Sequence, residues 1–107
     1  YDDTSNLYQV EIQELELEKN KKVEESKNLK KDFENRYFSL MKELKNLERE
    51  NMLFKMKYEI YKMRYEQGSD SYINYAEKYD EYIENSIDLE RKRNEVNALI
   101  YEIKYRR

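Results

Sequence analysis

Apolar and aromatic residues recur at alternating spacings of three and four from Tyr37 to Ile103. This spacing puts them on one face of a helix and is typical of a heptad seam, the stripe along which helices pair in coiled coils. Four residues within it, Asn51, Gly68, Ser86 and Arg93, are neither apolar nor aromatic. The predicted seam consists of Tyr37, Leu40, Leu44, Leu47, Asn51, Phe54, Tyr58, Tyr61, Tyr65, Gly68, Tyr72, Tyr75, Tyr79, Tyr82, Ser86, Leu89, Arg93, Val96, Ile100 and Ile103.

The composition favours helices over any other class of structure. Proline is absent and Gly68 is the single glycine, so the residues that sheets and tight turns need are almost missing. With 42% charged and 38% hydrophobic residues, the chain can fill a narrow seam more easily than a thick core. The sequence therefore predicts an all-α fold of long coiled-coil helices. Disorder of the isolated chain is the competing interpretation, but a net charge of −3 and the regular spacing favour folding with a partner.

The seam is weaker near the N-terminus and divides the chain into predicted segments. Lysine and serine occupy three seam places between Leu15 and Leu29. We expect residues 1–32 to form a weakly paired N-terminal helical extension, with Tyr8, Ile12, Leu15 and Leu29 on its apolar side. Residues 33–67, beginning with Phe33, are the first predicted coiled-coil helix, residues 68–71 a turn or interruption, and residues 72–107 the second helix.

Gly68, Ser69 and Asp70 are the predicted turn. Glycine can adopt the left-handed conformation just past a helix end, and Ser69 or Asp70 can cap the start of the next helix. The result would be an antiparallel helical hairpin.

A near mirror symmetry of the seam about Gly68 supports the hairpin. Counting outward from Gly68 matches five pairs of seam residues: Tyr65 with Tyr72, Tyr61 with Tyr75, Tyr58 with Tyr79, Phe54 with Tyr82, and polar Asn51 with polar Ser86. A continuous coiled-coil rod remains an alternative, because the heptad phase passes through Gly68 without a slip. A third possibility is a three-helix bundle in which residues 5–31 fold back.

The residue inventory excludes most catalytic and cofactor-binding sites. Without histidine or cysteine, and with one glycine, the chain lacks Ser-His and Cys-His pairs, phosphate-binding loops and histidine-containing metal motifs. Carboxylate pairs such as Glu84 with Asp88 are interpreted as a solvated helix face. We therefore predict no enzyme activity, no cofactor or metal, and no small-molecule substrate.

The sequence also predicts where the chain resides. Its longest apolar run, Ala98 to Tyr101, is far too short to cross a bilayer, and no signal-peptide pattern opens it. We expect an intracellular segment, cytoplasmic or cytoskeletal.

These features predict a structural coiled-coil scaffold or spacer that mediates protein–protein assembly with itself or with another coiled-coil protein. Asn51 is expected to fix the register of pairing. An alternative is an adaptor that binds one protein partner through the Tyr-rich region around Gly68. A more distant alternative is nucleic-acid contact through the basic C-terminus, where Arg91, Lys92, Arg93, Lys104, Arg106 and Arg107 give residues 91–107 a net charge of +4, although the whole chain is acidic. The acidic residues 1–18 could instead lie along this basic end of a second copy.

Overall fold

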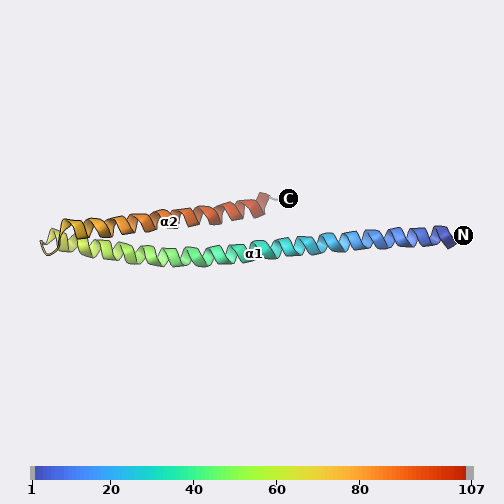
Figure 1. Ribbon diagram of the computed structural model, residues 1–107, viewed down its shortest axis with the longest axis horizontal. Coiled ribbons are helices and arrows are strands. Elements are labelled where there is room, and N and C mark those ends of the chain that lie inside the picture. Colours follow the sequence, from blue (N-terminus) through green and yellow to red (C-terminus); the bar gives the residue numbers. More distant parts are fainter. Residues whose placement is uncertain (1, 106–107) are drawn as a thin grey trace. The chain divides into compact units, whose positions relative to one another are not determined.

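The chain forms two helices. A computed structural model describes residues 2–105, with α1 spanning Asp2–Glu66 and α2 spanning Tyr72–Tyr105 (Figure 1). No strand occurs among these residues, so the predicted all-α class is confirmed. The contacts divide the chain into two units, residues 1–35 and residues 36–107.

The unit of residues 1–35 is helical throughout its described part. Every side chain from Thr4 to Asp32 is exposed, including Tyr8 at 64%, Ile12 at 54% and Leu15 at 65%. Phe33, at the end of this unit, is 9% exposed. A stretch without a covered apolar face gains little from packing, so the helical order of residues 4–32 depends on local propensity.

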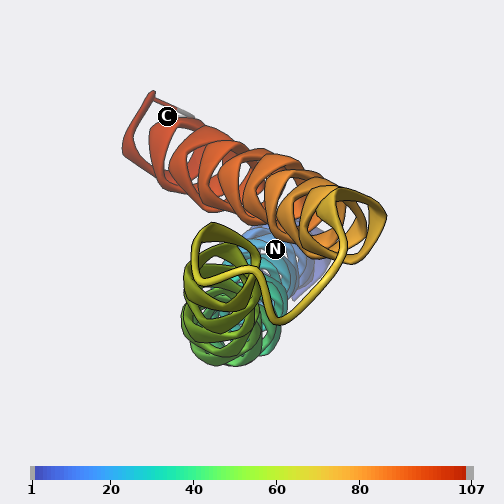
Figure 2. The ribbon, with the colours of Figure 1, turned by 90° about the vertical axis from the view of Figure 1, so that its left-hand side faces the viewer.

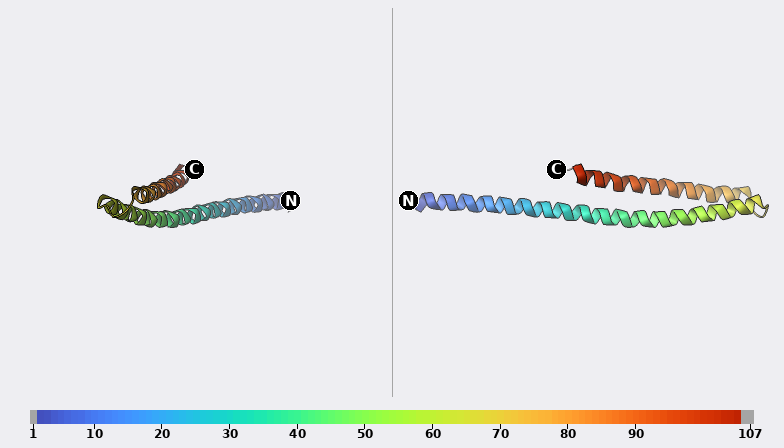
Figure 3. Two further views of the ribbon diagram at one scale, coloured as in Figure 1. Left: turned by 60° about the vertical axis from the view of Figure 1, so that its left-hand side comes forward. Right: turned by 180° about the vertical axis from the view of Figure 1, so that it is seen from behind.

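In the unit of residues 36–107, the last part of α1 lies beside α2, as Figure 1 and the rear view in Figure 3 both show. The buried centre consists of Leu44, Leu89 and Val96, against which four half-buried residues pack: Tyr37, Leu40, Met41 and Leu47. Arg36, the first α1 residue of this unit, contacts Glu102 near the end of α2. Tyr65, near the end of α1, contacts Tyr72 at the start of α2. The two helices therefore run in opposite directions within this unit.

The end of α1 is a Schellman motif. Gly68 has φ = 71°, its N–H donates to the carbonyl of Tyr65 at 3.0 Å, and the N–H of Ser69 donates to the carbonyl of Arg64 at 2.8 Å. These bonds occupy carbonyls that the last helical turn would leave unpaired. Figure 2 shows the connection crossing from one helix to the other.

Ser71 caps the start of α2. Its Oγ accepts a hydrogen bond from the N–H of Asn74 at 3.1 Å, and its carbonyl accepts the N–H of Tyr75 at 3.3 Å. The cap is thus one residue beyond the predicted pair, because Ser69 is used by the preceding helix end, where its Oγ donates to the carbonyl of Arg64.

Asp70 supports the same cap. Its Oδ1 accepts hydrogen bonds from the Asn74 amide and from the N–H of Ser71, both at 2.8 Å. These bonds, with the charge of Arg64, lower the pKa of Asp70 below its ordinary 3.8. The ionised form is therefore favoured in the folded chain. Its stabilisation is present above pH 3.8 and is lost as the pH falls through the lowered pKa.

Within the described part of the chain, neither helix combines the length and the apolar character needed to cross a membrane.

Candidate helix pairing surface

The pairing surface is the set of α1 and α2 side chains that meet within residues 36–107. Its most covered part lies toward the C-terminal end of α2, where Leu89 is 6% exposed, Val96 5% and Leu99 2%. Leu44 of α1, 8% exposed, packs in the same cluster. Fully burying one such side chain stabilises a fold by about 1.5–3 kcal/mol, so this part carries much of the pairing free energy.

A polar layer crosses the middle of the surface. Asn51 Nδ2 donates to Ser86 Oγ at 2.9 Å, and Ser86 Oγ donates to the carbonyl of Tyr82 at 2.8 Å. Next to them, Asn85 is 7% exposed and its Nδ2 lies 3.5 Å from Glu50 Oε2. The Oδ1 of Asn85 is buried without a hydrogen-bond partner among the described residues. In this layer, Asn51 and Ser86 form a short hydrogen bond, whereas the amide of Asn85 has one long contact and an oxygen without a partner among the described residues.

Tyrosine rings fill the surface near the turn. The ring of Tyr58 lies 5.1 Å from that of Tyr79, 5.9 Å from Tyr75 and 5.7 Å from Tyr82, centroid to centroid. Tyr65 contacts Tyr72 at 5.6 Å and Tyr75 at 5.6 Å. Such ring pairs add roughly 0.5–1.5 kcal/mol each beyond the area they bury.

Charged residues border the pairing surface. Lys92 Nζ lies 2.6 Å from Glu43 Oε2 on the other helix and 3.2 Å from Glu95 Oε2 on its own. Hydrogen bonds to Glu43 and then Glu95 raise the pKa of Lys92 above its ordinary 10.5, because both carboxylates favour the charged form of the lysine. Arg36 Nη1 and Glu102 Oε2 lie 3.8 Å apart. Both ion pairs join α1 to α2 and favour the same alignment of the helices as the polar layer.

The predicted seam residues of α1 face α2. Leu44 is buried, and Leu40, Leu47, Asn51, Phe54, Tyr58 and Tyr61 are half-buried. Tyr65, in the last turn of α1, is 41% exposed although it contacts two rings of α2.

The predicted seam residues of α2 divide into two groups. Leu89 and Val96 are buried, and Tyr75, Tyr82 and Ser86 are half-buried. The others are more exposed: Tyr72 at 60%, Tyr79 at 41%, and Ile100 and Ile103 at 44% each.

Four residues of the pairing surface lie one position before predicted ones. Lys78, Asn85, Lys92 and Leu99 are buried or half-buried where the heptad pattern selects Tyr79, Ser86, Arg93 and Ile100. The four residues are spaced by seven, so the heptad repeat is kept and α2 is rotated about its own axis by a constant amount relative to the prediction. The apolar Leu99 beside the seam was the available signal for this rotation.

Of the five predicted mirror pairs, three contact each other: Asn51 with Ser86, Tyr58 with Tyr79, and Tyr65 with Tyr72. In the other two, Tyr75 and Tyr82 place their rings against Tyr58. Antiparallel helices stagger their side chains, so one ring touches several neighbours.

The basic residues near the C-terminus pair with carboxylates. Arg91 Nη1 lies 4.0 Å from Asp88 Oδ1, Arg93 Nη1 lies 3.6 Å from Glu90 Oε2, and Lys92 binds Glu43. Lys104 has its Nζ 5.5 Å from the centroid of the Tyr105 ring. Arg106 and Arg107 lie outside the described residues.

No family model, curated protein or solved structure matches the chain.

Proposed function

We propose that residues 36–107 act as an antiparallel coiled-coil hairpin, a structural scaffold or spacer that mediates protein–protein assembly. The observation that carries the proposal is the joint alignment of the buried cluster, the Asn51–Ser86 hydrogen bond and the Lys92–Glu43 ion pair. Apolar burial, a polar pair and a charge pair all favour one register, as expected of a module that must hold a fixed geometry. The proposal assigns no catalytic step and no cofactor.

Alanine substitution of the buried leucines tests this proposal. Leu44→Ala with Leu89→Ala removes two covered side chains, and each such truncation costs about 2–5 kcal/mol when it leaves a cavity. The matched control is Leu7→Ala with Leu17→Ala, where the leucines are 61% and 68% exposed. Urea denaturation followed by circular dichroism should show a large loss of stability in the first variant and little in the second. Equal stability of the two variants would refute pairing as the basis of the fold.

An adaptor role for the Tyr-rich turn is the second candidate. The exposure of Tyr72 at 60%, with Tyr65 and Tyr79 at 41% each, leaves ring surface beside the turn that another protein could cover. Replacing Tyr65 and Tyr72 by alanine distinguishes the roles. If these rings are a docking surface, the variant keeps its helicity and its melting temperature, whereas loss of both assigns the rings to the hairpin core.

A further inference from the structure

Helix α2 carries three neighbouring columns of residues, each repeating every seven positions. The shared column packs on α1 and belongs to the predicted seam: Tyr75, Tyr82, Leu89 and Val96. On one side of it lies the inner column, which is buried or half-buried: Lys78, Asn85, Lys92 and Leu99. On the other side lies the outer column, which the heptad pattern selects: Tyr79, Ser86, Arg93 and Ile100. Either of these two columns completes a seam with the shared column, because both follow the alternating spacing of three and four.

The inner column is polar for a covered column. It contains two lysines and an asparagine, and Leu99 is its one apolar member. Asn85 is 7% exposed, and its Oδ1 has no hydrogen-bond partner among the described residues. A buried amide oxygen without a donor destabilises the packing around it. The contacts of the inner column are therefore not the best that α2 can offer to α1.

The outer column holds apolar surface that the same packing leaves in solvent. Tyr79 is 41% exposed and Ile100 44%. Arg93 lies 3.6 Å from Glu90 of its own helix. Covering this column would bury a tyrosine ring and an isoleucine and would return Asn85 to solvent, but it would uncover Leu99 of the inner column. The two packings thus exchange groups of similar size and polarity.

We propose that α2 has two rotational states on α1, which differ by about 50° about the axis of α2. One state covers the inner column, as in this structure, and the other covers the outer column. The angle follows from the seven-residue repeat, which sets neighbouring columns about 51° apart. Side chains packed between helices interlock, so the helix turns between discrete states. The inference rests on the proposed hairpin, to which it adds a conformational device.

Lys55 and Ile83 lie on the side of the hairpin that the outer column faces. Glu50 contacts Asn85 of the inner column, so that column faces one flank of the α1 seam. Lys55, four residues after Asn51, lies on the opposite flank. Ile83 lies next to the outer column on α2, since it comes four residues after Tyr79. A turn that brings the outer column onto α1 therefore carries Ile83 toward Lys55.

Electron spin resonance between labels at Lys55 and Ile83 measures this turn. Both residues are exposed. With a helix radius of about 5–6 Å including side chains, a turn of about 50° moves the helix surface by about 4–5 Å. The label distance should be below roughly 30 Å in either state of the hairpin and shorter in the state that covers the outer column. A continuous helix would give about 40 Å at 1.5 Å per residue.

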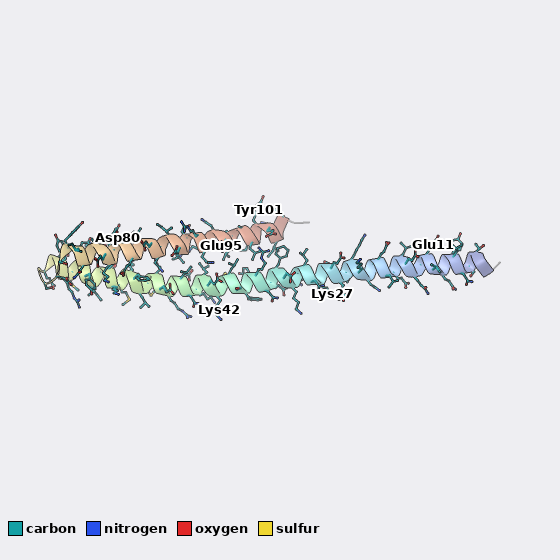
Figure 4. The ribbon with its side chains drawn as sticks, in the orientation of Figure 1. Glu11, Lys27, Lys42, Asp80, Glu95 and Tyr101 are labelled. Carbon is teal, nitrogen blue, oxygen red and sulfur yellow. The ribbon has the colours of Figure 1, made fainter. Side chains whose placement is uncertain are left out.

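Three consecutive positions of α2 provide matched variants. Lys92→Leu adds a leucine to the inner column, and Arg93→Leu adds one to the outer column with the same change in net charge. Asn94→Leu is the control on the side of α2 away from α1. Asn94 precedes Tyr101 by one heptad, and Figure 4 shows Tyr101 on that side.

The two seam variants should shift the label distance in opposite directions. We expect Lys92→Leu to favour the longer distance and Arg93→Leu the shorter one, each changing the ratio of the two states by about tenfold or more, because burying a leucine favours the state that covers it. The wild type should lie between them, and Asn94→Leu should match the wild type. Asn85→Leu, also on the inner column, should behave like Lys92→Leu.

An identical distance in Lys92→Leu and Arg93→Leu would overturn the two-state proposal and leave the hairpin in place. Loss of the hairpin in Arg93→Leu would also overturn it, because the second state should accommodate that leucine. A distance of about 40 Å in the wild type would instead contradict the hairpin itself, and the rotation with it.

Discussion

Asn85 is a buried residue of the pairing surface whose side-chain hydrogen-bonding groups are incompletely paired. Its side chain is 7% exposed, its Oδ1 lacks a partner among the described residues, and its contact with Glu50 is long at 3.5 Å. A buried polar group without a hydrogen bond costs about 1–3 kcal/mol. We expect Asn85→Leu to raise the melting temperature in a calorimetric scan. The same change at exposed Asn94 is the control. A lower melting temperature for Asn85→Leu would show that the amide is satisfied in solution.

The hydrogen bond between Asn51 and Ser86 should make the contributions of the two side chains to stability interdependent. At 2.9 Å and partly buried, it is expected to contribute about 1 kcal/mol. A double-mutant cycle with Asn51→Ala and Ser86→Ala measures this coupling by urea denaturation. Additive losses, with no coupling beyond about 0.3 kcal/mol, would contradict a role for Asn51 in setting the register.

At the scale of elements, the connection between α1 and α2 depends on backbone conformation at Gly68. No atom lies within 4 Å of a Cβ added there, so Gly68→Ala creates no clash, but its φ of 71° is costly for any L side chain. We expect this substitution to destabilise the fold by about 1–2 kcal/mol in urea denaturation. Gln67→Ala, one residue earlier, should change little. If Gly68→Ala changes the free energy of unfolding as little as Gln67→Ala does, residue 68 does not adopt the left-handed conformation in solution.

Capping at Ser71 gives a separate prediction for α2. Ser71→Ala removes the acceptor for the Asn74 N–H and should cost about 1 kcal/mol. Ser39→Ala, at an exposed position within α1, is the control and should be neutral or stabilising. Equal melting temperatures for the two variants would place the cap at another residue.

The sequence predicted the elements better than it predicted the faces of α2. Helix boundaries followed from Gly68 and the seam, because glycine and apolar spacing act locally. Covered Asn85, Lys92 and Leu99 did not follow from the heptads, because two neighbouring columns of α2 share the seven-residue repeat and the packing on α1 decides which of them is covered. The cap at Ser71 was missed for a similar reason: Ser69, Asp70 and Ser71 can all accept the bond, and the geometry of the preceding helix end decides among them.

At the scale of the whole molecule, the proposed hairpin depends more on apolar burial than on charge. Its pairing surface contains buried leucines and half-buried tyrosines, and the ion pairs lie at its border. Salt screens exposed ion pairs and leaves apolar burial in place, so we expect a salt series to change the melting temperature only slightly. Circular dichroism at several salt concentrations measures this effect. A large loss of stability in salt would contradict apolar burial as the main source of pairing.

The distance between labels at Glu48 and Asn97 tests the central claim most directly. Both residues are exposed, so cysteine substitution and labelling at these positions should leave the pairing surface intact. Labelled chain diluted into an excess of unlabelled chain reports distances within one molecule. Antiparallel helices about 10 Å apart predict a label distance below roughly 30 Å. A distance of about 70 Å or more, as a continuous helix would give at 1.5 Å per residue, would contradict the hairpin.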